Sequence, residues 1–133
     1  MSTKWALRIA LFWTLFLATS CLLPASTFKP ISFNLFQLDK AIHLVLYFTL
    51  SVLWVNYCVH RQRFSTKTAI AILSSSVTYG ILIEILQSVS HLGRSYEFDD
   101  IIANCIGAIV GVILAKPLIK KLPLVKKYLP FVL

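Results

Sequence analysis

Four long apolar runs constrain the fold of this chain more than any other feature. They extend over residues 5–23, 41–59, 68–88 and 101–119, and hydrophobic residues make up 58% of the 133-residue sequence. Each run has roughly the 20 residues that an α-helix needs to cross the hydrocarbon core of a bilayer, at about 1.5 Å per residue. The sequence therefore predicts an all-α, integral membrane protein, a bundle of four transmembrane helices that forms a single domain over residues 1–133.

The basic residues predict how these helices are oriented. If both termini lie in the cytoplasm, ten of the thirteen Lys and Arg side chains fall in inner segments, and only Lys29, Lys40 and Arg94 fall in outer ones. This is the inside-positive distribution of multi-pass proteins. The basic tail, residues 120–133, is then expected at the anionic lipids of the cytoplasmic face. The net charge of +8 does not indicate nucleic acid, because the basic residues flank the apolar runs and do not gather on one polar face.

The first run has a second interpretation, as a secretory signal. Basic residues precede an apolar stretch that ends in small residues before Cys21, which is the order of features in such signals. Cleavage there, with lipid attached to Cys21, would leave three spans and an outer N-terminus, whereas an uncleaved run fits an even number of spans. Cys21, Cys58 and Cys105 lack the paired spacing of a metal or redox site. We expect them to be packing residues, and the sequence predicts no metal and no cofactor.

Three polar side chains are expected at one depth in the bundle. Glu84 lies inside the third run, where an acidic side chain costs about 2.5 to 3.5 kcal/mol and therefore usually has a partner. His43 lies at the start of the second helix, and Asn104 lies about one turn into the fourth. The helical rise places all three within roughly 10 Å of the outer boundary. We expect the three helices to bring these groups together.

Helical spacing places further polar side chains on the same faces, because residues three or four positions apart are neighbours on a helix surface. Polar stripes on three helices would meet near the outer face, together with Arg94 from the loop between the last two. The predicted ligand-binding residues are Asp39, Lys40, His43, Tyr47, Glu84, Gln87, Arg94, Asp100 and Asn104. Small residues at positions 103, 107 and 111 form a ridge that would allow close approach of the fourth helix to a neighbour.

Taken one at a time, these residues have simpler interpretations. His43 and Asn104 could each form an interhelical hydrogen bond, Tyr47 could be an amphipathic aromatic side chain, and the two cations, Lys40 and Arg94, could lie among lipid headgroups. Taken together they indicate a functional polar pocket that faces outward. All five acidic residues of the chain lie at or near this one face.

Two blocks of this pattern resemble the VanZ-like membrane proteins, a family named for a member linked to glycopeptide (teicoplanin) resistance in bacteria. The first block holds Asp39, Lys40, His43 and Tyr47. The second holds, in order, Glu84, Gln87, Arg94, Asp100, Asn104, Gly107 and Gly111. The resemblance covers most of the chain between these blocks and implies a multi-pass protein of the bacterial cytoplasmic membrane, in the cell envelope. For function, the resemblance implies only a link to antibiotic resistance, which is a phenotype, and it implies no particular biochemical activity.

Two functions fit the predicted pocket, and a structural role is a third interpretation. The first function is non-enzymatic binding of an anionic or lipid-linked envelope ligand beside membrane lipids, with Arg94 and Lys40 as cationic contacts. The second is an enzyme that acts on lipid or cell-wall precursors, with His43 and either Glu84 or Asp100 as its acid and base. In the structural interpretation, the polar network locks the helices of a subunit of a larger membrane complex.

Overall fold

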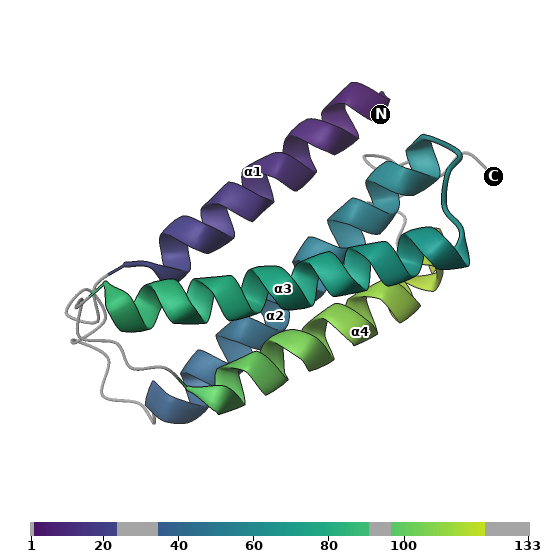
Figure 1. The fold of residues 1–133 in the computed structure, drawn as a ribbon. Coiled ribbons are helices and arrows are strands. Elements are labelled where there is room, and N and C mark those ends of the chain that lie inside the picture. The colour runs from purple at the N-terminus through teal and green to yellow at the C-terminus, as the bar shows by residue number, and fades with distance from the viewer. Residues whose placement is uncertain (1, 24–34, 91–96, 122–133) are drawn as a thin grey trace.

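The computed structural model describes residues 2–23, 35–90 and 97–121, which form four α-helices (Figure 1). The helices are α1 (Thr3–Cys21), α2 (Leu35–His60), α3 (Thr66–Val89) and α4 (Phe98–Lys121). These residues contain no β-strand, so the all-α prediction is confirmed. Asp99 and Asp100 lie in the first turn of the last helix.

Three of the four helices are long and apolar enough to cross a membrane. The spans are Leu38–His60, Thr66–Val89 and Phe98–Leu118, which support the prediction of a membrane protein. Within the described ranges, α1 is not in this set. It has 19 residues, and Lys4 and Arg8 in its first turns lower its mean hydropathy. The structure thus confirms helices at all four apolar runs, and it does not confirm the predicted count of four spans.

Helices α2 and α4 run in the same direction and approach closely along a ridge of glycines. A Cβ atom added to Gly107 would overlap the carbonyl oxygen of Leu44. One added to Gly111 would lie 2.6 Å from the carbonyl oxygen of Phe48, closer than real side chains come. The predicted small-residue ridge therefore lies against the backbone of α2, and this contact aligns the N-terminal ends of the two helices.

Helix α1 packs on α2 and α3 through side chains that bind backbone carbonyl groups. The indole nitrogen of Trp13 donates to the carbonyl oxygen of Leu46 at 3.1 Å, and the hydroxyl of Tyr79 donates to that of Thr14 at 2.6 Å. The three helices share one apolar core, formed by Leu17, Cys21, Leu46, Tyr47, Leu50 and Ile83. Cys21 is buried in this core, as expected for a packing residue.

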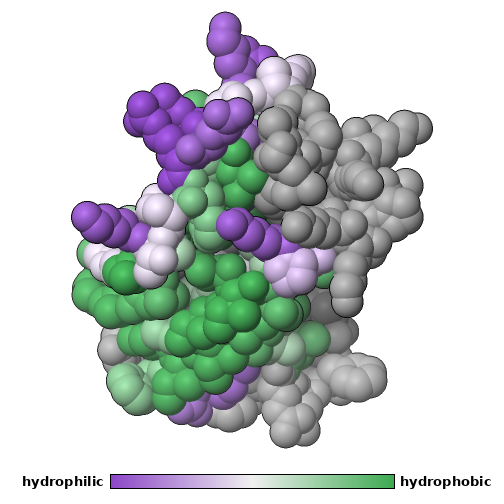
Figure 2. All heavy atoms as spheres, turned by 90° about the vertical axis from the view of Figure 1, so that its right-hand side faces the viewer, coloured by the Kyte–Doolittle hydropathy of each residue, from purple (hydrophilic) through white to green (hydrophobic). Residues whose placement is uncertain are grey.

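Charged side chains are divided between the two ends of the bundle, and the surface between them is apolar. One end carries exposed basic residues at the start of α1, the end of α2, the start of α3 and the end of α4: Lys4, Arg8, Arg61, Arg63, Lys67 and Lys116. Figure 2 views the molecule from this end and shows hydrophilic groups in purple beside a broad green apolar surface. Leu15, Ile70 and Ile113 are among the apolar side chains exposed along the helices. Such a surface suits contact with lipid tails.

Candidate functional site

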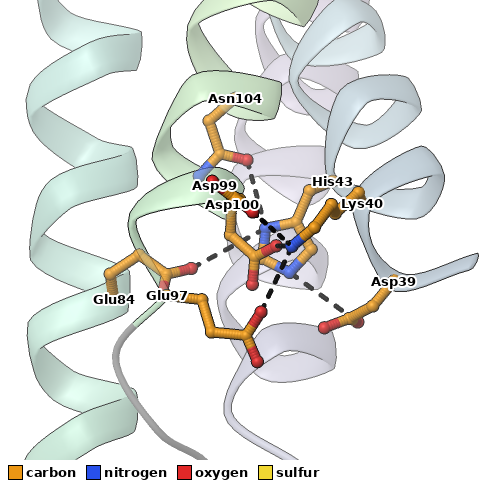
Figure 3. Close-up of polar contacts among 8 residues, drawn as sticks. All are labelled: Asp39, Lys40, His43, Glu84, Glu97, Asp99, Asp100 and Asn104. Carbon is orange, nitrogen blue, oxygen red and sulfur yellow. Dashed lines mark hydrogen bonds and ion pairs between the residues drawn. The ribbon is translucent and has the colours of Figure 1, made fainter. Parts of the chain in front are cut away.

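The end of the bundle opposite the exposed basic residues holds all five acidic residues of the chain, and we call it the acidic end. It is organised around the imidazole of His43 (Figure 3). Its Nδ1 donates a hydrogen bond to Oδ1 of Asn104 at 3.1 Å and lies 3.8 Å from Oε1 of Glu84. On the other side of the ring, Nε2 lies 4.0 Å from Oδ1 of Asp39, one helical turn earlier on α2. The predicted meeting of His43, Glu84 and Asn104, from three different helices, is therefore observed.

These groups lie inside the bundle and do not face lipid. The exposed fraction is 2% for His43, 1% for Glu84, 1% for Asn104 and 4% for Asp100. Removing polar groups from water is costly unless they find partners, and buried polar groups in proteins are accordingly almost always paired. Nδ1 of His43, 3.8 Å from Oε1 of Glu84, is the polar neighbour that the place of this carboxyl in an apolar helix predicts.

Lys40 faces three carboxylates at this end of the bundle. Its Nζ is 3.2 Å from Glu97, 3.5 Å from Asp100 and 3.6 Å from Asp99. Asp100 is buried, whereas Asp99 is exposed. The ammonium group therefore contacts one carboxylate inside the site and another at its surface. Carboxylates outnumber ammonium groups among the described side chains here, and the site has an acidic balance.

Tyr47 and Asn104 both lie against Gly80 of α3. A Cβ atom on Gly80 would lie 3.1 Å from Nδ2 of Asn104 and 3.3 Å from Cε1 of Tyr47. Among the residues that the structure describes, the hydroxyl of Tyr47 and Nδ2 of Asn104 are buried without a hydrogen-bond partner. These two donors lie next to the charged groups and can bind a polar ligand or water.

Gln87, one of the predicted ligand-binding residues, contacts α1 and not the imidazole. Gln87 shares a face of α3 with Glu84, yet its Nε2 donates to the carbonyl oxygen of Cys21 at 2.7 Å. Its side chain therefore holds the end of α1, where the last carbonyl groups of a helix need donors. Arg94 lies outside the described residues.

One set of described side chains has the composition of a metal-ligand group. A ligand atom from each of Asp39, His43 and Asp100 can be chosen so that all lie within 4.8 Å of one another. The sequence predicted no metal, because metal sites are recognised by short spacings and these ligands come from α2 and from α4, far along the chain. Only the pairing of the two helices brings them together.

Comparison with known proteins identifies the group to which this chain is related. A family model described as VanZ/LLP1 matches residues 3–121. The chain belongs to the VanZ/LLP1 family. The resemblance seen in the sequence is thereby confirmed, and the match includes α1 as well as the three apolar spans. Neither the curated proteins nor the solved structures gave a match.

The two blocks that resemble VanZ/LLP1 proteins lie side by side in the fold. The block on α2 contributes Asp39, Lys40 and His43, and the block on α3 and α4 contributes Glu84, Asp100 and Asn104, all shown in Figure 3. Two further residues of the site, Glu97 and Asp99, were not among the predicted ligand-binding residues. Their place in the sequence next to Asp100 could have indicated that they belong to the site. The structure adds that both carboxylates contact Lys40.

Proposed function

We propose that this VanZ/LLP1 protein binds the polar head of a lipid-linked envelope molecule at the outer leaflet of the bacterial cytoplasmic membrane. In this proposal α1 is a fourth span, both termini are cytoplasmic, and the exposed basic end lies inside. The acidic end then lies at the outer headgroups. A link to glycopeptide resistance would follow if the bound molecule is a cell-wall precursor.

The observation that carries the proposal is the polar cluster at one end of three helices that can span a membrane. His43, Glu84 and Asn104 are buried there, about a turn or two from the helix ends. At this depth, a ligand could place its polar head among side chains and leave its hydrocarbon tail along the exposed apolar helices. Sites that combine an apolar surface with a few directed polar groups are typical of small-molecule binding.

The charge of the site favours particular groups on the ligand. Carboxylates accept hydrogen bonds from hydroxyl and amine groups, such as those of sugars and amino acids. A phosphate on the same ligand would be bound by Lys40, already held by three carboxylates, and by Arg94 from the sequence. Both cations are needed, because the surrounding acids would otherwise repel an anion.

Replacing Lys40 and Arg94 together by alanine should weaken the binding of a lipid-linked wall precursor by about tenfold or more, because each charge-assisted hydrogen bond contributes about 1.5 to 3 kcal/mol. The measurement is titration of the precursor into the full-length protein in lipid nanodiscs. The matched control replaces Arg63 and Lys67, two exposed cations at the opposite end, and should leave the affinity unchanged. Equal affinity in both double variants would remove the proposed contacts.

An enzyme of lipid or cell-wall precursor metabolism is the second candidate, favoured by the position of His43 between carboxylates on both sides of its ring. Such a ring can pass a proton between a substrate and an acidic partner. Glu84→Gln keeps the shape of the side chain but removes its proton site. If the carboxyl takes part in proton transfer, this variant should lose about 100-fold or more in turnover of the precursor, a typical effect for an acid or base. Full turnover by the variant would exclude that role.

A further inference from the structure

We propose that Asp39, His43 and Asp100 form a binding site for a divalent transition-metal ion, for which Zn²⁺ is the best match. The inference stands on the geometry of these three side chains and does not depend on the identity of any lipid ligand. One histidine and two aspartates, drawn from two helices, supply the nitrogen and oxygen ligands that Zn²⁺ takes in proteins.

The spacing of the three side chains suits a shared ion better than direct contact. Nε2 of His43 and Oδ1 of Asp39 are 4.0 Å apart, which is too long for a hydrogen bond. Ligand atoms at about 2.0 to 2.2 Å from one ion lie at most about 4.4 Å from each other. The set of ligand atoms within 4.8 Å therefore needs only a small adjustment of side chains to close on an ion. Asp39 and His43 are one turn apart on α2, and the glycine contact holds α4 beside them.

The hydrogen bonding of His43 independently points to a ligand at Nε2. Nδ1 faces two oxygen atoms, Oδ1 of Asn104 at 3.1 Å and Oε1 of Glu84 at 3.8 Å, so this nitrogen carries the proton. In the neutral ring, Nε2 then presents a lone pair toward the aspartates. The side chain is only 2% exposed, and Oδ1 of Asp39 lies 4.0 Å from Nε2, beyond hydrogen-bond distance. Metal-binding histidines have the same arrangement, with the second nitrogen donating to an oxygen that orients the ring.

The negative charges around the site favour a cation, and the ammonium group of Lys40 would compete with a metal ion for the carboxylate of Asp100. All five acidic residues of the chain lie at this end, and Lys40 is the basic residue placed among them within the described ranges. Its Nζ lies 3.5 Å from Oδ1 of Asp100, so an incoming ion must share that carboxylate with the ammonium group. Glu97 and Asp99 also face Lys40, at 3.2 Å and 3.6 Å, and they would keep the ammonium group in place when Asp100 turns to the ion.

The ligand types indicate which ion is bound. An imidazole nitrogen favours Zn²⁺ or Co²⁺ over Mg²⁺ and Ca²⁺, which prefer oxygen ligands. Three protein ligands leave a coordination position for water or another oxygen, as in catalytic zinc sites. The side chain of Asp39 is 34% exposed, so this position is reached from the acidic end. An ion there could bind the phosphate of the proposed lipid-linked ligand; that last step alone rests on the proposed function.

The test titrates Co²⁺ alone into full-length protein in detergent, purified with a tag that contains no histidine and stripped of metal with a chelator. We expect a visible absorption band that saturates at one Co²⁺ per chain and disappears when Zn²⁺ is added. Asp39→Asn should weaken Co²⁺ binding by about tenfold or more, and Asn104→Ala, which removes the oxygen behind the ring, by about 10- to 100-fold. Lys40→Gln should tighten it, because the competing ammonium group is gone.

The charge-matched comparison is Asp99→Asn, the same substitution at an exposed acid that contacts Lys40 but is not one of the three ligands. It removes a negative charge near the site but no ligand atom, so its loss of Co²⁺ affinity should be several times smaller than that of Asp39→Asn. A folded wild-type protein that binds no Co²⁺ would overturn the inference, and so would equal losses in Asp39→Asn and Asp99→Asn, which would indicate attraction by charge alone. Because the probe is the metal ion without lipid, this result is separable from the precursor titration.

Discussion

Gly107→Ala should separate α2 from α4 and cost about 3 kcal/mol or more of stability, the upper part of the range for overpacked sites. The added methyl group would overlap the carbonyl oxygen of Leu44, and a backbone atom cannot turn aside as a side chain can. The expected result is a large drop in the thermal unfolding temperature of the detergent-solubilised protein, measured by circular dichroism. Because Asp39 and Asp100 are held on these two helices, Co²⁺ binding should fall with it.

Gly80→Ala is the matched control for this prediction. The new Cβ atom would lie 3.1 Å from Nδ2 of Asn104 and 3.3 Å from Cε1 of Tyr47. Both neighbours are side-chain atoms, which can shift by a few tenths of an ångström. We expect a loss of about 1 kcal/mol, near the lower end of the cost of overpacking. A Gly107→Ala protein that is as stable as the Gly80→Ala protein would show that the glycine contact does not hold α2 and α4 together.

His43→Phe should cost about 2 to 3 kcal/mol of stability, because it removes the ring N–H to Asn104 from a buried position. The aromatic ring roughly preserves the packing volume, so the loss reports the polar contacts with Asn104 and Glu84. The expected result is a lower unfolding temperature together with the loss of Co²⁺ binding and of precursor binding. Thermal unfolding with and without the metal ion separates the effect on the fold from the effect on the ligand.

His60→Phe provides the comparison for this variant at the other end of the same helix. His60 is half-buried, and among the described residues its Nε2 has no hydrogen-bond partner. Its replacement should change stability by less than about 1 kcal/mol, because the buried Nε2 loses no hydrogen bond to a described residue. Equal losses at positions 43 and 60 would mean that the polar contacts of His43 contribute nothing beyond packing.

Much of the site could be predicted from the sequence, because helical periodicity decides which residues share a face. The four-residue spacing of Asp39 and His43, and of Asp100 and Asn104, placed each pair on one stripe, and the cost of Glu84 in an apolar helix required a polar partner. The ridge that includes Gly107 indicated where a neighbouring helix would come close. These are local properties of single helices, and the structure agrees with them.

Contacts that depend on how helices are turned against each other could not be predicted in this way. Gln87 shares a stripe with Glu84, but the rotation of α3 directs its amide to the end of α1. Lys40 was expected to meet a ligand, and the structure surrounds it with carboxylates of α4 and of the residue before it. Asp39 and His43 are one turn apart on α2, but Asp100 is separated from them by the rest of α2, all of α3 and two connections, so no local spacing rule reveals the full set.

The parallel course of α2 and α4 also affects the electrostatics of the acidic end. Each helix carries a macrodipole whose positive pole lies at its N-terminus, and parallel neighbours place two such poles side by side, where they repel. Asp99 and Asp100 lie in the first turn of α4. Carboxylates in a first turn typically contribute about 0.3 to 1 kcal/mol each toward helix stability. Asp100, one of the acids that would hold a cation, thus also offsets the unfavourable alignment of the two helices, so binding and folding are linked through the same side chain.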